Sequence, residues 1–279
     1  TSDIYFRLCR KTPSFMIKKK TTEIKIHVPV KDNELIQKAL DRINKDKHIY
    51  TLWRVVNTNA VDRLGMTDHG PVHVQIVANI GLRLTRMLID SGTEMSITTD
   101  YKLNKKYAEL VVVLASIFHD LGMSISRSGH EEYSLFLCND ILYKLLDFLD
   151  EEEKTIVISE VLHAIISHRS DGRPLTIEAG IIRISDALDM CKGRSRIAYE
   201  SGKTDIYSVS ATAIDCINIE KGTKKPIQIN IMMNNSAGIF QVDELLKKKI
   251  KNSGIEQYIS IRAFINQEVE TKILKEYIL

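Results

Sequence analysis

The chain has 279 residues and a formal net charge of +3, with positive and negative side chains mixed along its length. That length suits one large domain, or one domain with a small second one. The small charge excess argues against a nucleic acid or an anionic membrane as partner, but it is compatible with a local basic pocket for a small anion.

The four cysteines are far apart and form no CxxC motif; they are Cys9, Cys138, Cys191 and Cys216. This spacing predicts reduced thiols in a cytoplasmic protein and not a disulfide framework. No apolar run approaches the roughly 20 residues needed to cross a bilayer, and the N-terminus has no apolar secretory core. The sequence begins with Thr1, and Met16, just before a lysine run, is a plausible alternative start. We therefore assign no function to residues 1–20.

The first predicted elements are a short strand and two helices. Residues 23–30 (EIKIHVPV) alternate, and Asp32 is placed to cap a helix with apolar residues at helical spacing as far as Ile43. Pro71 suits the first turn of a second helix, with His73 on its apolar face. The polar segment 92–104 is predicted to be a connection.

Residues 108–118 (AELVVVLASIF) are apolar almost all round, which is typical of a buried central helix. This segment leads directly into His119 and Asp120, and Gly122 is a stop signal. Amphipathic stretches over 131–149 and 154–168 predict two more helices. After a loop at 170–174, Thr176 is expected to cap a last helix through Met190.

After about residue 203 the pattern changes to strands. Residues 214–220 and 226–233 alternate around a turn and predict a hairpin. Residues 242–250 predict a helix ending before Gly254, with the lysines of 247–251 on its exposed face, and residues 259–265 alternate again. The organisation is therefore an N-terminal extension (1–30), a helical domain (31–203) and a small α+β domain (204–279).

Six of the eight histidines fall between positions 69 and 168, near predicted helix ends or apolar faces; they are His69, His73, His119, His130, His163 and His168. Asp120 adjoins one of them, and Asp186 lies inside the apolar run IIRISDALDM. Buried carboxylates are costly unless they are paired or bind a metal, and buried imidazoles need partners for both nitrogens. A shared metal site would satisfy both requirements. Imidazole and carboxylate ligands suit Mn, Fe, Zn, Co, Ni or Mg as divalent ions, without choosing among them.

The order of these residues resembles the H…HD…D signature of the HD superfamily of metal-dependent phosphohydrolases. Three contexts carry the resemblance: PVHVQIVANIGLRL, VVVLASIFHDLG and IIRISDALDM. It covers roughly residues 60–195 and implies a mainly α protein, with an HD-type helical bundle before the α+β unit. One departure is Met123, where many members of the family carry a lysine.

The resemblance implies metal ligands at His73, His119, Asp120 and Asp186. His130 and His168 occupy places comparable to the extra histidines of two-metal members, so one or two ions are expected, with Asp120 as the bridging and catalytic carboxylate. Both histidines could instead be core residues bonded to backbone carbonyls. His163 is expected to be structural, and His27 and His48 are expected at the surface.

Substrate phosphate is expected to contact His69 at the start of its helix, together with basic residues that flank the ligands, namely Arg127, Lys192, Arg194 and Arg196. A solvated basic loop is the competing interpretation. The expected substrate is a phosphorylated small molecule, and the resemblance favours a nucleotide. The 204–279 unit is expected to cover substrate or to form a homodimer.

Hydrolysis of a phosphate ester or anhydride by metal-activated water is the favoured function. Two alternatives remain open. One is a non-catalytic nucleotide sensor, and the other is a di-iron oxygenase built on the same helical core.

Overall fold

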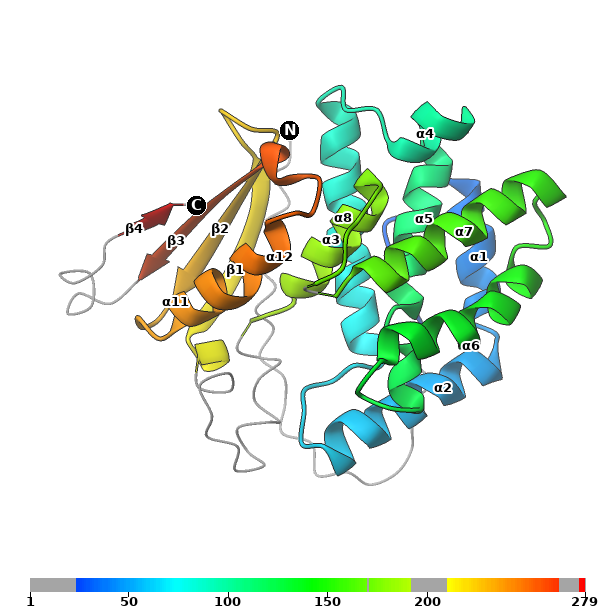
Figure 1. Ribbon diagram of the computed structural model, residues 1–279, viewed down its shortest axis with the longest axis horizontal. Helices are drawn as coiled ribbons and strands as arrows, with labels where there is room; N and C mark the ends of the chain where they lie inside the picture. The colour runs from blue at the N-terminus through cyan, green and yellow to red at the C-terminus, as the bar shows by residue number, and fades with distance from the viewer. Residues whose placement is uncertain (1–23, 170, 192–209, 266–275, 279) are drawn as a thin grey trace.

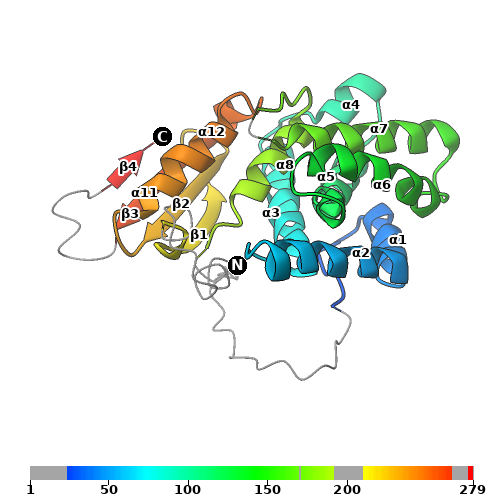
Figure 2. The same cartoon turned by 60° about the horizontal axis from the view of Figure 1, so that its bottom comes forward.

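The computed structural model describes residues 24–169, 171–191, 210–265 and 276–278. These residues form a helical bundle and, beside it, a small sheet with a helical segment (Figures 1 and 2). The predicted site residues Lys192, Arg194 and Arg196 lie outside the described residues, as does Cys9. Among the described cysteines, Cys138 is a buried free thiol.

The bundle contains eight α-helices among the described residues: α1 (Glu34–Ile43), α2 (Lys47–Asn57), α3 (Pro71–Asp90), α4 (Ser96–Tyr101), α5 (Lys105–Phe118), α6 (His130–Leu145), α7 (Glu151–Ser167) and α8 (Ile177–Ala187). Five of them, α1, α2, α5, α7 and α8, begin at a residue whose side chain accepts a backbone N–H of the first turn. The Thr176 side chain accepts the Ala179 N–H as predicted, and Pro71 is in the first turn of α3. The first helix is capped by Asn33 and not by its neighbour Asp32.

Helix α5 is the centre of the bundle and packs against α3, α7 and α8. Every residue from Leu110 to Phe118 is buried. The stretch Lys105–Ser124 is a longer apolar segment than the sequence analysis expected, and by length and composition it could cross a membrane. However, 94% of that apolar window is buried inside the protein, as expected for the core helix of a bundle.

Two local predictions were wrong. Residues 24–30 form no strand among the described residues; Ile26 is instead buried, with its N–H bonded to Asn44 Oδ1 at 2.8 Å. The segment 92–104 is not only a connection, because it contains α4, whose Ile97 is fully buried. Alternation and polarity were misleading because a few buried side chains anchor these segments, Ile26 in the first and Met95 and Ile97 in the second.

The C-terminal unit is built on a four-stranded sheet with the order β1 (Ile214–Lys221), β2 (Ile227–Met233), β3 (Ile259–Ile265) and β4 (Glu276–Ile278). The predicted hairpin is confirmed, since β1 and β2 are antiparallel. Strands β2 and β3 are parallel, so the chain between them must cross over. It does so through a continuous helical segment, α11 (Gly238–Phe240), η3 (Gln241–Leu246) and α12 (Lys247–Ile250).

Helix α8 joins the two parts of the molecule. A Cβ on Gly180 would lie 2.3 Å from Ser253 O, so only glycine allows this close approach. One turn further along α8, the buried Arg183 donates to the carbonyls of Gly172, Lys248 and Lys249. These contacts fix the end of α12 against the bundle.

Candidate metal centre

His119 and Asp120 follow directly after the buried helix α5, and both side chains are buried. The Nδ1 atom of His119 lies 2.9 Å from Ser116 O, one turn back along the helix. A carbonyl can only accept, so Nδ1 keeps its proton, and Nε2 is the nitrogen that becomes a lone-pair donor when the ring is neutral. The end of α5 therefore presents one imidazole nitrogen and one carboxylate to the interior.

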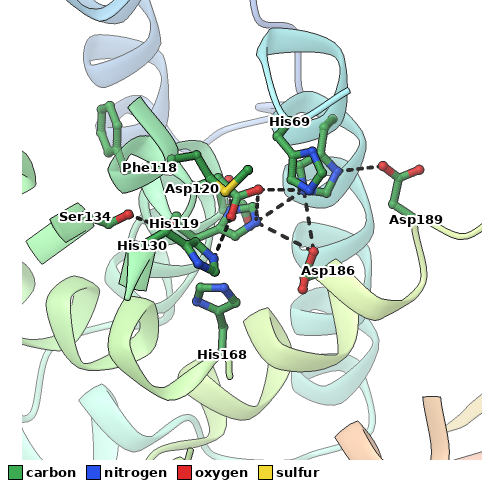
Figure 3. A network of polar contacts seen from close by, with 12 residues as sticks. His69, Phe118, His119, Asp120, His130, Ser134, His168, Asp186 and Asp189 are labelled. Atoms are coloured by element: carbon green, nitrogen blue, oxygen red, sulfur yellow. Dashed lines mark hydrogen bonds and ion pairs between the residues drawn. The ribbon is translucent and has the colours of Figure 1, made fainter. Parts of the chain in front are cut away.

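His73 on α3 and Asp186 on α8 lie next to this pair. Figure 3 labels three of the four residues, His119, Asp120 and Asp186. His73 Nε2 is 3.3 Å from His119 Nε2 and 3.3 Å from Asp120 Oδ2. Asp186 Oδ1 is 3.5 Å from His73 Nε2 and 3.7 Å from His119 Nε2. The four predicted ligands thus converge, and we refer to them as the first cluster.

The ring of His73 is oriented by a residue that the sequence analysis missed. Asp189 Oδ2 accepts from His73 Nδ1 at 2.6 Å, and the two side chains are 7% and 1% exposed. A carboxylate behind a ligating imidazole fixes its tautomer and raises its basicity. The sequence feature that could have pointed to Asp189 is its position three residues after Asp186.

A second cluster begins at the other oxygen of Asp120. His130 Nε2 is 3.2 Å from Asp120 Oδ1, and ligand atoms of His168 come within 4.8 Å of those of His119 and Asp120. His168 Nδ1 is 2.6 Å from Ile165 O, which leaves its Nε2 as a lone-pair donor. Asp120 therefore stands between the first cluster and a second one formed with His130 and His168.

Burial and charge set the protonation of these groups in the metal-free protein. Burial would raise the pKa of Asp120 and of Asp186, but neighbouring cationic groups hold both pKa values well below the usual range. Burial would lower the pKa of His119, but the charges of the two carboxylates raise it to about 9. For His168, burial and then the charge on His119 lower the pKa to about 3. The two ionised carboxylates, beside the neutral imidazole of His168, form an environment that attracts a cation, and a bound metal ion would replace the second proton of His119.

The donors fit a divalent metal ion. The first cluster offers two imidazole nitrogens and two carboxylate oxygens, a set that borderline divalent ions accept at about 2.0–2.2 Å. The ligand atoms of His73, His119 and Asp186 all lie within 4.8 Å of one another. Because each imidazole is also held through its second nitrogen, the site is largely preorganised.

A family model described as "HD domain" matches residues 72–191, the segment that contains both clusters. The chain belongs to the HD superfamily of metal-dependent phosphohydrolases. A protein of Methanocaldococcus jannaschii, "Uncharacterized protein MJ1020", is 42% identical over 229 residues, which cover 82% of this chain and 88% of that protein. The similarity to this relative is thus longer than the HD match.

Of the predicted phosphate-binding residues of this HD protein, two lie next to the clusters. The His69 ring is 5.5 Å from that of His73, and its Nδ1 is 2.7 Å from Thr67 O. Arg127 Nη1 is 3.0 Å from His130 Nδ1. His163 is separate: its Nε2 accepts the Leu175 N–H at 3.0 Å, which holds the loop after α7, in line with the structural role expected for it.

One lysine of the HD protein corrects the sequence analysis. Lys249 does not lie on an exposed face, since its side chain is only 18% exposed and its Nζ is 3.2 Å from Asp186 Oδ2. Lys249 also donates to His168 O. Its neighbours Lys247 and Lys248 are 51% and 62% exposed, as expected for that face. The run of lysines gave no sign of which one turns inward.

A pocket of about 520 Å³ opens beside Asp186 and Asp189. The bundle contributes Thr67, Arg127 and residues at the end of α8, and the C-terminal unit contributes Ala211, Phe240, Gln241, Glu244, Leu245, Lys248 and Lys249. The volume is within the range of small-molecule sites. Met123 is fully buried against Val56 and Ala60, so it takes no part in this pocket.

Proposed function

We propose that this HD protein hydrolyses a phosphate ester or anhydride of a nucleotide. The observation that carries the proposal is the position of Asp120, whose two carboxylate oxygens face two different groups of imidazoles. A carboxylate with this geometry can hold two cations a few ångströms apart. That arrangement suits in-line displacement at phosphorus.

The residues that would hold the metal divide between the two clusters. His73, His119 and Asp186 would hold one ion, His130 and His168 a second, and Asp120 would bridge them. When bound, such ions supply an activated water nucleophile near neutral pH and positive charge for the phosphoryl oxygens.

The protein's own groups supply orientation and charge around the reacting phosphate. Asp189 keeps the His73 ring in the tautomer that presents Nε2 to the cluster. Lys249 and Arg127 line the adjacent pocket and would bind phosphoryl oxygens, which stabilises the charge that develops in the transition state. The proposal needs no nucleophilic serine or cysteine.

Turnover of defined compounds tests this proposal. Protein loaded with Mn²⁺ would be incubated with nucleoside mono-, di- and triphosphates, cyclic nucleotides and p-nitrophenyl phosphate, and released phosphate or nucleoside would be measured. We expect divalent-dependent hydrolysis that stops with EDTA and falls at least about 100-fold in His119→Ala. The matched control is His48→Ala, which changes an exposed histidine in α2.

Two results would contradict the proposal. Nucleotide binding without hydrolysis under any divalent metal would indicate a sensor. Product formation that requires oxygen and stops in anaerobic buffer would indicate an oxygenase.

A further inference from the structure

Lys249 belongs to the C-terminal unit, yet its ammonium group lies at the first cluster in the bundle. It contacts Asp186 through Oδ2, while Asp186 Oδ1 is the oxygen that faces His73 and His119. The lysine therefore leaves the ligand oxygen of Asp186 open to a cation. It adds a positive charge on the side of the cluster that borders the pocket.

Helix α8 fixes this position by a series of contacts at three-residue spacing. Gly180 lets Ser253 approach, Arg183 binds the carbonyls of Lys248 and Lys249, and Asp186 meets the Lys249 ammonium. Residues three apart share one face of a helix. The face of α8 that carries a metal-ligand candidate therefore also positions α12, so Lys249 is a built part of the site.

The Lys249 ammonium has capacity for a ligand. An ammonium group has three N–H donors. Among the described residues, two of them are directed to His168 O and Asp186 Oδ2. The third can bind an oxygen that enters the pocket, and a phosphoryl oxygen beside the first cluster would have the required charge.

The rest of the pocket is suited to the organic part of the substrate, to which the phosphate is attached. Besides its charged and polar residues, the pocket is lined by apolar residues that include Phe240, Met190, Ala211 and Leu245. The carboxylate of Glu244 adds an acceptor for hydroxyl or amino groups. A pocket of about 520 Å³ whose lining combines cationic side chains with Phe240 and other apolar residues fits a compact phosphate ester of a planar ring compound.

We infer that the C-terminal unit is the substrate-recognition half of the site. Lys249 binds the phosphoryl group at the first cluster, and the wall around Phe240 holds the base of a nucleoside monophosphate. This inference rests on the proposed function for the identity of the reaction, but not for phosphate binding itself.

The first experiment measures inorganic phosphate binding to the full-length, metal-loaded protein by calorimetry. Lys249→Met is compared with Lys247→Met, which removes the same charge from an exposed position on the same helix. We expect Lys249→Met to keep its metal content while its Kd for phosphate rises at least 10-fold, and Lys247→Met to bind like the wild type. Lys249→Arg keeps the positive charge and is expected to restore part of the affinity.

The second experiment separates binding of the phosphate from binding of the rest of the substrate. Phe240→Ala is expected to raise KM for a nucleoside monophosphate at least 10-fold. It should leave KM for p-nitrophenyl phosphate and Kd for inorganic phosphate within about twofold of wild type. Circular dichroism and melting temperature identify any variant that fails to fold, and in that case Lys249→Gln or Phe240→Leu replaces it.

Three results would overturn the inference. One is wild-type protein that binds no phosphate, and another is Lys249→Met with an unchanged phosphate Kd. The third is Lys249→Met that loses metal but binds phosphate normally once metal is saturating, because the lysine would then only orient Asp186. If the wild type binds phosphate but hydrolyses nothing, the proposed function fails, and the role of Lys249 is judged on the phosphate Kd alone.

Discussion

The contact between Asp189 and His73 allows a quantitative prediction. The Nδ1–Oδ2 distance is 2.6 Å and both side chains are almost fully buried. A hydrogen bond to a charged group contributes about 1.5–3 kcal/mol, against about 0.5–1.5 kcal/mol for a neutral one. Asp189→Asn should therefore cost about 1–1.5 kcal/mol of metal-binding free energy, or roughly 10-fold in affinity, and Asp189→Ala about 10–100-fold.

Titration of the metal-free protein with Mn²⁺ by calorimetry measures this loss. Only binding at the first cluster should weaken, because His130 and His168 make no described contact with Asp189. Asp90→Asn, at an exposed aspartate where α3 ends, is the control for removal of one negative charge. Equal losses at both binding steps, or no loss at either, would refute the reasoning that Asp189 acts through the ring of His73.

Three other predictions concern metal number, pH and packing. His168→Ala should reduce the bound metal from two equivalents to one, measured by elemental analysis; retention of two would remove His168 from the ligand set. In the metal-free protein, burial lowers the pKa of His119 but the carboxylates of Asp120 and Asp186 raise it to about 9, so its proton stabilises the fold fully below about pH 6.5 and this stabilisation is lost as the pH rises through 9. Urea denaturation should show the free energy of unfolding falling between pH 7 and 9 by at most about 1.4 kcal/mol per pH unit. If the His119→Gln variant shows the same fall with pH, the assignment of this pH dependence to His119 is wrong. Gly122→Ala would place a Cβ 1.9 Å from His130 O, so it should destabilise the protein by about 1–3 kcal/mol or more. If the variant unfolds at the same urea concentration as the wild type, α6 can shift to relieve the clash.

The sequence was sufficient to predict the helical core, and the family resemblance supplied six ligand candidates whose side chains the structure brings together; their role as ligands stays a prediction. For His119 and Asp120, the fully apolar segment before them indicated burial, and the resemblance to the HD signature indicated a role as metal ligands. The same argument found Asp186, a carboxylate inside an apolar run. A buried polar residue in an apolar context is a strong local signal.

Other features depend on tertiary contacts that local patterns do not record. Lys249 was missed because its inward position comes from Arg183, a residue 66 positions earlier in the chain. Asp189 was missed because an aspartate near a helix end is common at surfaces. Strand β4 has only three residues, too few for an alternating pattern to be recognised.

Two of the cluster imidazoles share the same arrangement, a bond from Nδ1 to the carbonyl three residues earlier: His119 with Ser116, and His168 with Ile165. The direction of each donor nitrogen is thus fixed by a single turn of its own backbone. Fraying of that turn would misdirect the donor well before the bundle unfolds, and a bound cation would in return hold the turn closed. Amide exchange at the ends of α5 and α7 should therefore report metal occupancy more sensitively than the melting of the whole protein does.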